Sequence, residues 1–185
     1  MTAPAEAEAT ASLAGRLAHT ACVTGRFTLP DGQVLDSYFD EYRLAADPQL
    51  LHDVADAMAP LVPDGSEVLA GIELGGVPLV VALSAATGLP AAFLRRLPKS
   101  YGSQQQIEGT PVDGRRVVLV DDVVRSGGQL LAMTRTLRIA GARVADALCV
   151  LERPLGGRTL LADRGVTLTP LLTETDLPTA KEGLW

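Results

Sequence analysis

The sequence is poor in cysteine, lysine and aromatic residues, and it lacks two common nucleotide-binding motifs. Its two cysteines, Cys22 and Cys149, lie far apart with no CxxC pair, so we expect reduced, buried thiols and neither a disulfide framework nor a zinc site. No Gly-Lys pair occurs, which excludes a P-loop, and the stretch GIELGG does not match the dinucleotide fingerprint GxGxxG.

The charge balance is acidic, with a formal net charge of −6 and a sequence pI near 4.9. Phosphate backbones and anionic membranes attract basic surfaces, so we expect neither a nucleic acid nor a membrane as a partner. The N-terminus has acids where a signal peptide needs a basic start and an apolar core. Two prolines and a glycine also interrupt the uncharged stretch 74–94. We therefore expect a cytoplasmic protein.

A length of 185 residues, 47% of them hydrophobic, fits one domain with a sizeable core. We expect a frayed tail over residues 1–12 and a single domain over 13–185. Within that domain we expect an N-terminal hood-like portion (13–62) and a core (63–173).

From residue 67 onward, apolar segments alternate between strand and helix patterns. Strands are predicted over 67–72, 91–96, 116–120 and 144–151, and helices over 77–87 and 128–140. Upstream, the sequence predicts a helix over 13–22, two extended segments around a turn at 30–32, and a helix over 48–61 capped by Asp47. This alternation indicates an α/β fold with a mostly parallel sheet covered by helices on both faces.

Two adjacent acids, Asp121 and Asp122, follow the apolar run VVLV and precede the turn RSGG. In open α/β sheets ligands bind beyond the carboxyl ends of the strands, where we expect these acids to lie. The turn leads into a predicted helix whose free N–H groups attract an anion. Carboxylates that accept hydrogen bonds from hydroxyls, beside an anion cradle, suit a sugar phosphate. An apolar strand ending in two acids is also typical of a Walker B segment, so the pattern alone is moderately specific.

The stretch VVLVDDVVRSGGQ resembles the phosphoribosyl diphosphate signature of the type I phosphoribosyltransferases, in which apolar residues flank two acids before a Thr/Ser/Gly loop. Further segments resemble the orotate phosphoribosyltransferases, in that family's order: GRFTLPDGQVLDSYFD, AGIELGGVPLVVALSAATGLP, RRLPKSYGSQQQIEG and ERPLGGRTLLADRGVTLTPLLT. The resemblance covers about residues 25–173. It implies a type I phosphoribosyltransferase fold with a small N-terminal helix and strand subdomain and a mobile catalytic loop over 97–113.

The resemblance also implies how the donor, 5-phosphoribosyl 1-diphosphate, is held. Asp121, Asp122 and Lys99 are the implied catalytic residues, and Lys99 is one of only two lysines against fourteen arginines. The residues implied in phosphoribosyl and diphosphate binding are Glu73, Leu74, Gly75, Gly76, Arg95, Arg96, Lys99, Tyr101, Asp121, Asp122, Val123, Val124, Arg125, Ser126, Gly127, Gly128 and Gln129.

For the base, the resemblance implies an apolar wall formed by Tyr38 and Phe39, with Arg153 pairing with the carboxylate of orotate. The family usually has threonine where this chain has Arg125, and lysine where it has Arg96. A long cation in place of a small hydroxyl changes the size and charge of the base pocket, so Arg125 counts among the base-binding residues and the accepted base stays open.

The leading hypothesis is an enzyme of pyrimidine synthesis that forms orotidine 5′-monophosphate and diphosphate from orotate and the donor. One alternative, suggested by Arg125, is a paralogue that accepts a different base. Another is a regulator that senses the donor or a nucleotide without turnover, which the presence of Lys99 disfavours. The resemblance implies Mg²⁺, held through the diphosphate and ribose hydroxyls and not directly by side chains, and a homodimer with shared active sites.

Overall fold

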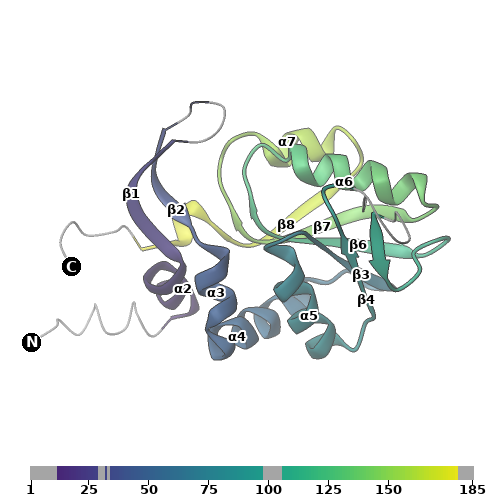
Figure 1. Ribbon diagram of the computed structural model, residues 1–185, viewed down its shortest axis with the longest axis horizontal. Coiled ribbons are helices and arrows are strands. Elements are labelled where there is room, and N and C mark those ends of the chain that lie inside the picture. The colour runs from purple at the N-terminus through teal and green to yellow at the C-terminus, as the bar shows by residue number, and fades with distance from the viewer. Residues whose placement is uncertain (1–11, 29–31, 33, 98–105, 179–185) are drawn as a thin grey trace, which may run out of the picture.

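The computed structural model describes residues 12–28, 32, 34–97 and 106–178 of the chain. A six-stranded sheet forms its centre (Figure 1). In spatial order the strands are β5 (Ile107–Gly109), β4 (Ala91–Leu94), β3 (Val68–Ile72), β6 (Arg116–Val124), β7 (Arg143–Glu152) and β8 (Thr167–Thr173). Neighbouring strands run parallel except β4 and β5, which pair antiparallel. The expected α/β class with a mostly parallel sheet is confirmed.

The strand order reverses between β3 and β6. β3 pairs with β4 on one side and with β6 on the other. The chain therefore passes from one side of β3 to the other before β6 begins. Such a reversal opens a crevice outside the carboxyl ends of the two strands, where α/β sheets bind their ligands. All five residues of β3 are buried, as are residues 117–121 of β6. The crevice therefore has a rigid floor.

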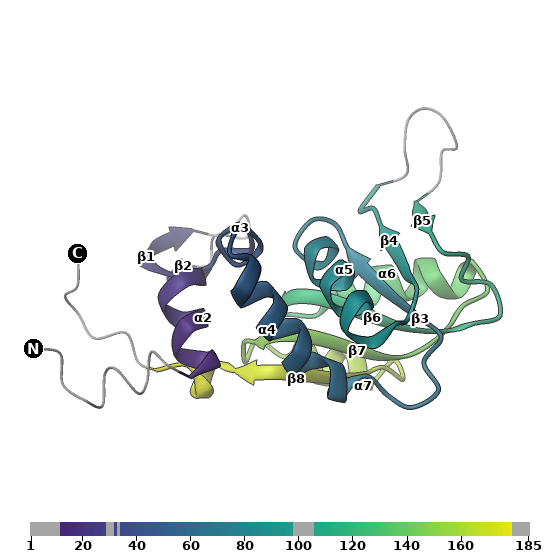
Figure 2. The ribbon, with the colours of Figure 1, turned by 90° about the horizontal axis from the view of Figure 1, so that it is seen from below.

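Helices cover both faces of the sheet (Figures 1 and 2). α4 (Pro48–Met58) and α5 (Gly76–Thr87) lie on one face, and α2 (Leu13–Ala21) and α3 (Glu41–Ala46) extend that layer. α6 (Gly128–Ile139) and α7 (Gly157–Ala162) lie on the other face. Successive strand side chains point to opposite faces, so β6 contributes Val118 and Val120 to one hydrophobic core and Val117 and Leu119 to the other.

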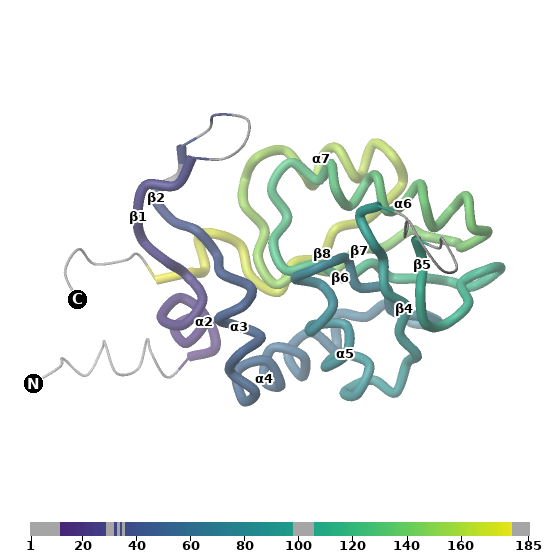
Figure 3. The backbone as a smooth tube through the Cα atoms, in the orientation of Figure 1, coloured from purple at the N-terminus to yellow at the C-terminus, as the bar shows by residue number. Residues whose placement is uncertain are grey.

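A second, two-stranded sheet lies at one end of the molecule. Its antiparallel strands are β1 (Cys22–Thr28) and β2 (Val34–Phe39). The chain enters α3 through Asp40, whose carboxylate accepts hydrogen bonds from the N–H groups of Tyr42 and Arg43. Figure 3 shows the chain returning to this hairpin after β8, at the 3₁₀ helix η2 (Glu174–Asp176).

Most predicted elements are present. The helix predicted over 48–61 is α4 followed by the 3₁₀ turn η1 (Ala59–Leu61), and Asp47 caps it by accepting hydrogen bonds from the N–H groups of Gln49 and Leu50. Of the turn predicted at 30–32, only Gly32 lies within the described residues. Five elements, α3, β5, α7, β8 and the 3₁₀ helix η2, were not predicted. No helix in the described part of the chain is long and apolar enough to cross a membrane.

The predicted end of the sixth strand at Val120 is wrong. β6 continues to Val124 because β7 runs on beside it, with Val123 paired to Leu151 and Val124 to Glu152. Asp121 and Asp122 therefore belong to the strand and not to the turn after it. They still lie at the crevice, because the neighbouring strand β3 ends at Ile72.

Candidate active site

A cavity of about 330 Å³ lies beyond the ends of β3 and β6. Four segments line it: the junction of β2 and α3, the turn after β3, the segment after β4, and the end of β6 with the turn into α6. The lining residues are Tyr38, Phe39, Glu41, Glu73, Leu74, Gly75, Arg96 and residues 121–130. The two segments singled out by the acid pair and by the GIELGG stretch thus meet in one pocket, and the N-terminal hairpin closes one side of it.

The acid pair forms the floor of the cavity. Asp121 is 5% exposed, and this burial, reinforced by the neighbouring charge of Asp122, raises its pKa well above the ordinary value. Burial also raises the pKa of Asp122, which is half-buried. The pair therefore holds a proton more tightly than exposed aspartates do, and it offers closely spaced acceptors to ligand hydroxyls.

The turn after β3 packs directly against these acids. A Cβ on Gly75 would lie 2.6 Å from the carboxyl carbon of Asp122, and one on Gly76 would lie 2.5 Å from the carbonyl oxygen of Val120. Glycine at both positions lets the turn backbone approach β6. The N–H of Glu73 donates to the carbonyl of Leu94 over 2.8 Å, which fixes the turn to β4, and the Glu73–Leu74 peptide bond is cis.

The turn after β6 opens α6 without a side-chain cap. Gly127, at the N-cap, has a φ of +75° in the left-handed region that favours glycine, and no side chain accepts from the first N–H groups of the helix. These groups, at the positive end of the helix dipole, point to an anion as their partner. Ser126 adds a hydroxyl on the same turn.

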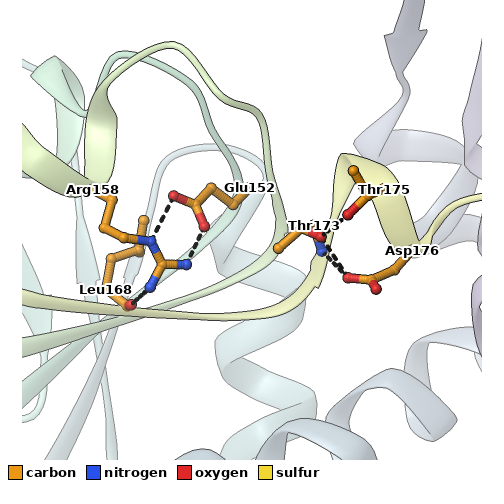
Figure 4. Close-up of polar contacts among 6 residues, drawn as sticks. All are labelled: Glu152, Arg158, Leu168, Thr173, Thr175 and Asp176. Atoms are coloured by element: carbon orange, nitrogen blue, oxygen red, sulfur yellow. Dashed lines mark hydrogen bonds and ion pairs between the residues drawn. The ribbon is translucent and has the colours of Figure 1, made fainter.

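α7 supports this turn from outside the cavity. The N–H of Gly157 donates to the carbonyl of Arg125 over 3.0 Å. Figure 4 shows how the start of α7 is anchored: Arg158 donates two hydrogen bonds to Glu152 at the end of β7 and one, of 3.2 Å, to the carbonyl of Leu168 in β8. α7, which supports the turn through Gly157, is therefore tied to both β7 and β8.

The hairpin contributes an aromatic side chain to the cavity wall. Tyr38 donates its hydroxyl hydrogen bond to Oε2 of Glu41 over 3.1 Å, and burial together with the Glu41 charge raises the pKa of Tyr38 to about 12. The guanidinium carbon of Arg125 lies 6.0 Å from the centre of the Tyr38 ring. Phe39, also at the lining, is 1% exposed and packs in the hydrophobic core.

Arg153 lies outside the cavity lining. It is 5% exposed, and its two Nη atoms donate to Oε1 of Glu174 over 3.1 Å and to the hydroxyl of Ser37 over 3.0 Å. Its backbone N–H donates to the carbonyl of Val124. The side chain thus joins β2 to η2 at the end of β7.

Of the cations assigned to the diphosphate, Arg96 lines the cavity and Arg95 is half-buried beside it. Gln106 contacts both arginines, because its side-chain amide donates hydrogen bonds to the carbonyls of Arg95 and Arg96 over 3.0 and 3.1 Å. Lys99 and Tyr101 lie outside the described residues.

Three residues at the site were not found in the sequence: Glu41 and Leu130, which line the cavity, and Gly157 behind it. Glu41 bonds to Tyr38 and lines the cavity, and its position three residues after Tyr38 was the available signal. Gly157, which supports the turn after β6, gave no signal except the glycine pair within PLGGR.

Fold and site together are those of a sugar-phosphate transferase, and the comparisons with known proteins agree. Residues 43–167 match the phosphoribosyl transferase domain family, and the chain belongs to this family. Within it the chain groups with the orotate phosphoribosyltransferases. It is 45% identical over 172 residues to the orotate phosphoribosyltransferase of a Nocardioides species, covering 93% of this chain and 96% of that one.

Solved structures show the same relationship. Orotate phosphoribosyltransferase from Aeropyrum pernix superposes with a TM-score of 0.79 at 31% identity, covering 89% of this chain and 94% of that one. The Mycobacterium tuberculosis enzyme in complex with 5-phospho-α-D-ribosyl 1-diphosphate superposes with a TM-score of 0.75 at 26% identity, covering 94% and 98%. The recognised family and the type I phosphoribosyltransferase fold are confirmed, and the chain is a phosphoribosyltransferase.

Proposed function

We propose that the protein transfers the phosphoribosyl group from 5-phosphoribosyl 1-diphosphate to orotate, giving orotidine 5′-monophosphate and diphosphate. The observation that carries the proposal is the close approach of Gly75, in the turn after β3, to Asp122. Asp122 lies near the end of β6, the strand that leads into the turn before α6. An acid pair flanked by two turns rich in backbone N–H groups matches a ribose that bears an anionic group at each end.

The donor would span the cavity between these turns. The amides and hydroxyl of residues 126–129 would hold the 5-phosphate at the start of α6, and Asp121 and Asp122 would accept hydrogen bonds from the ribose hydroxyls. The turn 73–76, of which residues 73–75 line the cavity and Gly76 does not, would hold the diphosphate, with Arg96 at the lining and Arg95 next to it in the chain.

Catalysis in this arrangement is electrostatic and positional. Displacement of diphosphate builds positive charge on the ribose ring, which the carboxylate oxygens of the acid pair stabilise, and negative charge on the departing group, which Arg95, Arg96 and Lys99 stabilise. The ring nitrogen of orotate needs little help from a general base, so no residue is assigned that role.

A divalent cation fits the carboxylate-rich cavity, since Mg²⁺ prefers hard oxygen ligands. The described residues contain no cluster of three or more side chains able to hold a metal ion, so the diphosphate and ribose hydroxyls would supply most of its ligands. When bound, the ion would neutralise charge on the leaving group.

The base would lie at the Tyr38 side of the cavity, with its flat face against the ring and with Phe39 nearby. Arg125 and Arg153 are the two arginines considered for its carboxylate, and only Arg125 lines the cavity. We further propose a cytoplasmic homodimer, in which cations of the segment that includes Lys99 serve the neighbouring subunit's site.

The test is to mix the purified protein with donor, Mg²⁺ and a panel of bases that includes orotate, and to follow diphosphate release. Release with orotate at an ordinary enzymatic rate is expected. Release only with another base would show a paralogue of different specificity, which the position of Arg125 in the cavity makes the second candidate. Donor binding without release would show a sensing protein and overturn the proposal.

A further inference from the structure

The half-buried ring of Tyr38 forms part of the cavity wall, and its hydroxyl is held by Glu41. The hydroxyl donates to Oε2 of Glu41 over 3.1 Å, and both residues line the cavity. Burial, together with the Glu41 charge, raises the pKa of Tyr38 to about 12. The hydroxyl therefore keeps its proton at neutral pH, and it remains a donor to the carboxylate.

The backbone that carries Glu41 is fixed by the cap of α3. Asp40, at the N-cap, accepts hydrogen bonds from the first N–H groups of the helix, and its own N–H donates to the carbonyl of Ala21 over 2.7 Å. The cap is thereby tied to the end of α2. Glu41 is the first residue of α3, so its side chain reaches back to Tyr38 from a defined position.

Two further side chains border the Tyr38 ring. The Phe27 ring, on β1, lies with its centre 5.7 Å away at an interplanar angle of 42°, and the guanidinium carbon of Arg125 lies 6.0 Å from the ring centre. Contacts with a ring face or edge tolerate a wide range of geometries, whereas a hydrogen bond weakens steeply when it is bent. Glu41 therefore supplies the directional contact that fixes the hydroxyl end of the ring.

The charge of Glu41 does not suit a direct role toward the donor. Glu41 shares the cavity lining with Asp121 and Asp122, and burial is the main cause that raises the pKa of both aspartates, with the Glu41 charge adding to it. A third carboxylate repels phosphate groups. Glu41 can aid binding either by accepting a hydrogen bond from the base or by acting through Tyr38. Its existing hydrogen bond with the Tyr38 hydroxyl favours the second role.

We propose that Glu41 is a positioning residue for the base: it holds the Tyr38 ring in the orientation against which the base stacks, so that the ring is ordered before the base arrives. The inference rests on the proposed function, because it takes the base to lie at the Tyr38 side of the cavity. Ordering one side chain in advance removes a cost of binding that corresponds to about three- to tenfold in Kd.

Two ligands that differ by the base isolate this effect. Orotidine 5′-monophosphate and ribose 5-phosphate share the sugar phosphate, so the ratio of their Kd values, measured by calorimetry, reports the contribution of the base. A general distortion of the cavity, or the loss of the Glu41 charge beside the phosphate, affects both ligands and leaves the ratio unchanged. Glu41→Ala should lower the ratio about three- to tenfold, and Tyr38→Phe, which removes the hydroxyl alone, should lower it by a similar factor.

A double variant decides how Glu41 acts. If it acts through Tyr38, Glu41→Ala should have no further effect on the ratio when it is combined with Tyr38→Phe. Glu41→Gln should keep most of the wild-type ratio, because its amide oxygen still accepts a hydrogen bond from the Tyr38 hydroxyl. The control is Glu67→Ala, which makes the same chemical change outside the cavity lining, at the other end of β3, and should keep the ratio.

The inference is overturned if Glu41→Ala lowers the ratio equally with and without the Tyr38 hydroxyl, which would show a direct contact with the base. It is also overturned if Glu41→Ala keeps the full ratio, if Glu41→Gln behaves like Glu41→Ala, or if the wild type gains no affinity from the base. Should Glu41→Ala not fold, Tyr38→Phe decides, and a full ratio in that variant overturns the inference.

Diphosphate release by the wild type is scored separately. A protein that binds the nucleotide without turnover would fail in that assay and could still show the expected Kd ratios, so failure of the proposed function and failure of the Glu41 inference are distinguishable.

Discussion

Gly127 and Gly157, thirty residues apart in sequence, are packed backbone against backbone. A Cβ on Gly127 would lie 3.0 Å from the Cα of Gly157, and a Cβ on Gly157 would lie 2.4 Å from the carbonyl oxygen of Arg125. The turn that we assign to the 5-phosphate therefore keeps its shape only while α7 presents a bare backbone to it.

Gly157→Ala should displace this turn, because the new methyl group has no room beside the Arg125 carbonyl. We expect KM for the donor to rise about tenfold or more, equivalent to roughly 1.4 kcal/mol of lost binding. The control is Gly165→Ala, where φ is +66° and a Cβ meets nothing within 4 Å. It should destabilise the fold by about 1–2 kcal/mol through backbone strain and leave KM unchanged. Equal effects of the two variants on KM would contradict the packing argument.

Asp121→Asn should stabilise the ligand-free protein while removing activity. The folded-state pKa of Asp121 is raised by burial, so its ionisation opposes folding and stability is lost as the pH rises from the unfolded pKa through the folded one. Thermal melts should show a gain for the variant that is absent near pH 3 and grows toward pH 8. Turnover should fall on the order of 10²-fold or more, as for loss of a group that stabilises developing charge.

Asp176 is an aspartate whose pKa is shifted in the opposite direction to that of Asp121 (Figure 4). Its carboxylate accepts hydrogen bonds from the side chain and N–H of Thr173, which lower its pKa. Its contribution to stability is therefore present above the unfolded pKa and lost as the pH falls through the folded one. Asp176→Asn should lower the melting temperature at pH 7 and have no effect at pH 2. Parallel pH trends for the Asp121 and Asp176 variants would refute the assigned cause.

Tyr38 should remain protonated throughout the working range of the protein. Its pKa of about 12 predicts little tyrosinate absorbance from this residue below pH 11, which the difference between alkaline titrations of wild type and Tyr38→Phe measures. Glu41→Gln should bring the midpoint down, because it removes the neighbouring charge. A Tyr38 midpoint near 10 in the wild type would mean that Tyr38 is neither buried nor in contact with Glu41 in solution.

Arg153→Gln should weaken the attachment of the hairpin. The change leaves Glu174 and Ser37 without their shared donor, and we expect a loss of about 1–2 kcal/mol of unfolding free energy, less than for a fully buried pair because Glu174 is 45% exposed. Chemical denaturation measures it. Glu174→Gln, which keeps a hydrogen-bond acceptor, should cost less. A larger loss from Glu174→Gln would place the stabilising interaction elsewhere.

The sequence was informative where apolar runs are long and local. The strands β3 and β6 were found because five or more consecutive residues are buried in each. β8 was missed because threonines and Pro170 interrupt its apolar pattern, which an edge strand tolerates. The extension of β6 past Val120 depends on pairing with β7, a non-local contact that the sequence of β6 does not contain.

The site residues likewise divide into those that local sequence patterns predict and those that depend on contacts between distant segments. The acid pair and the two glycine-containing turns were recognisable as local patterns, and the cavity brings them together. The partners of Arg153, which lie 116 residues before it and 21 residues after it, depend on how the hairpin and η2 dock. The contact of Arg125 with Tyr38 is set by the same docking.

The adjacency of β3 and β6 has a consequence for the sugar. Hydrogen-bonded strands lie roughly 4.8 Å apart, so the groups that we assign to the leaving diphosphate and those that we assign to the ribose hydroxyls follow from strands one inter-strand spacing apart. We expect this fixed separation to discriminate by length, so that donors with a six-membered ring place their leaving group out of register with the turn 73–76.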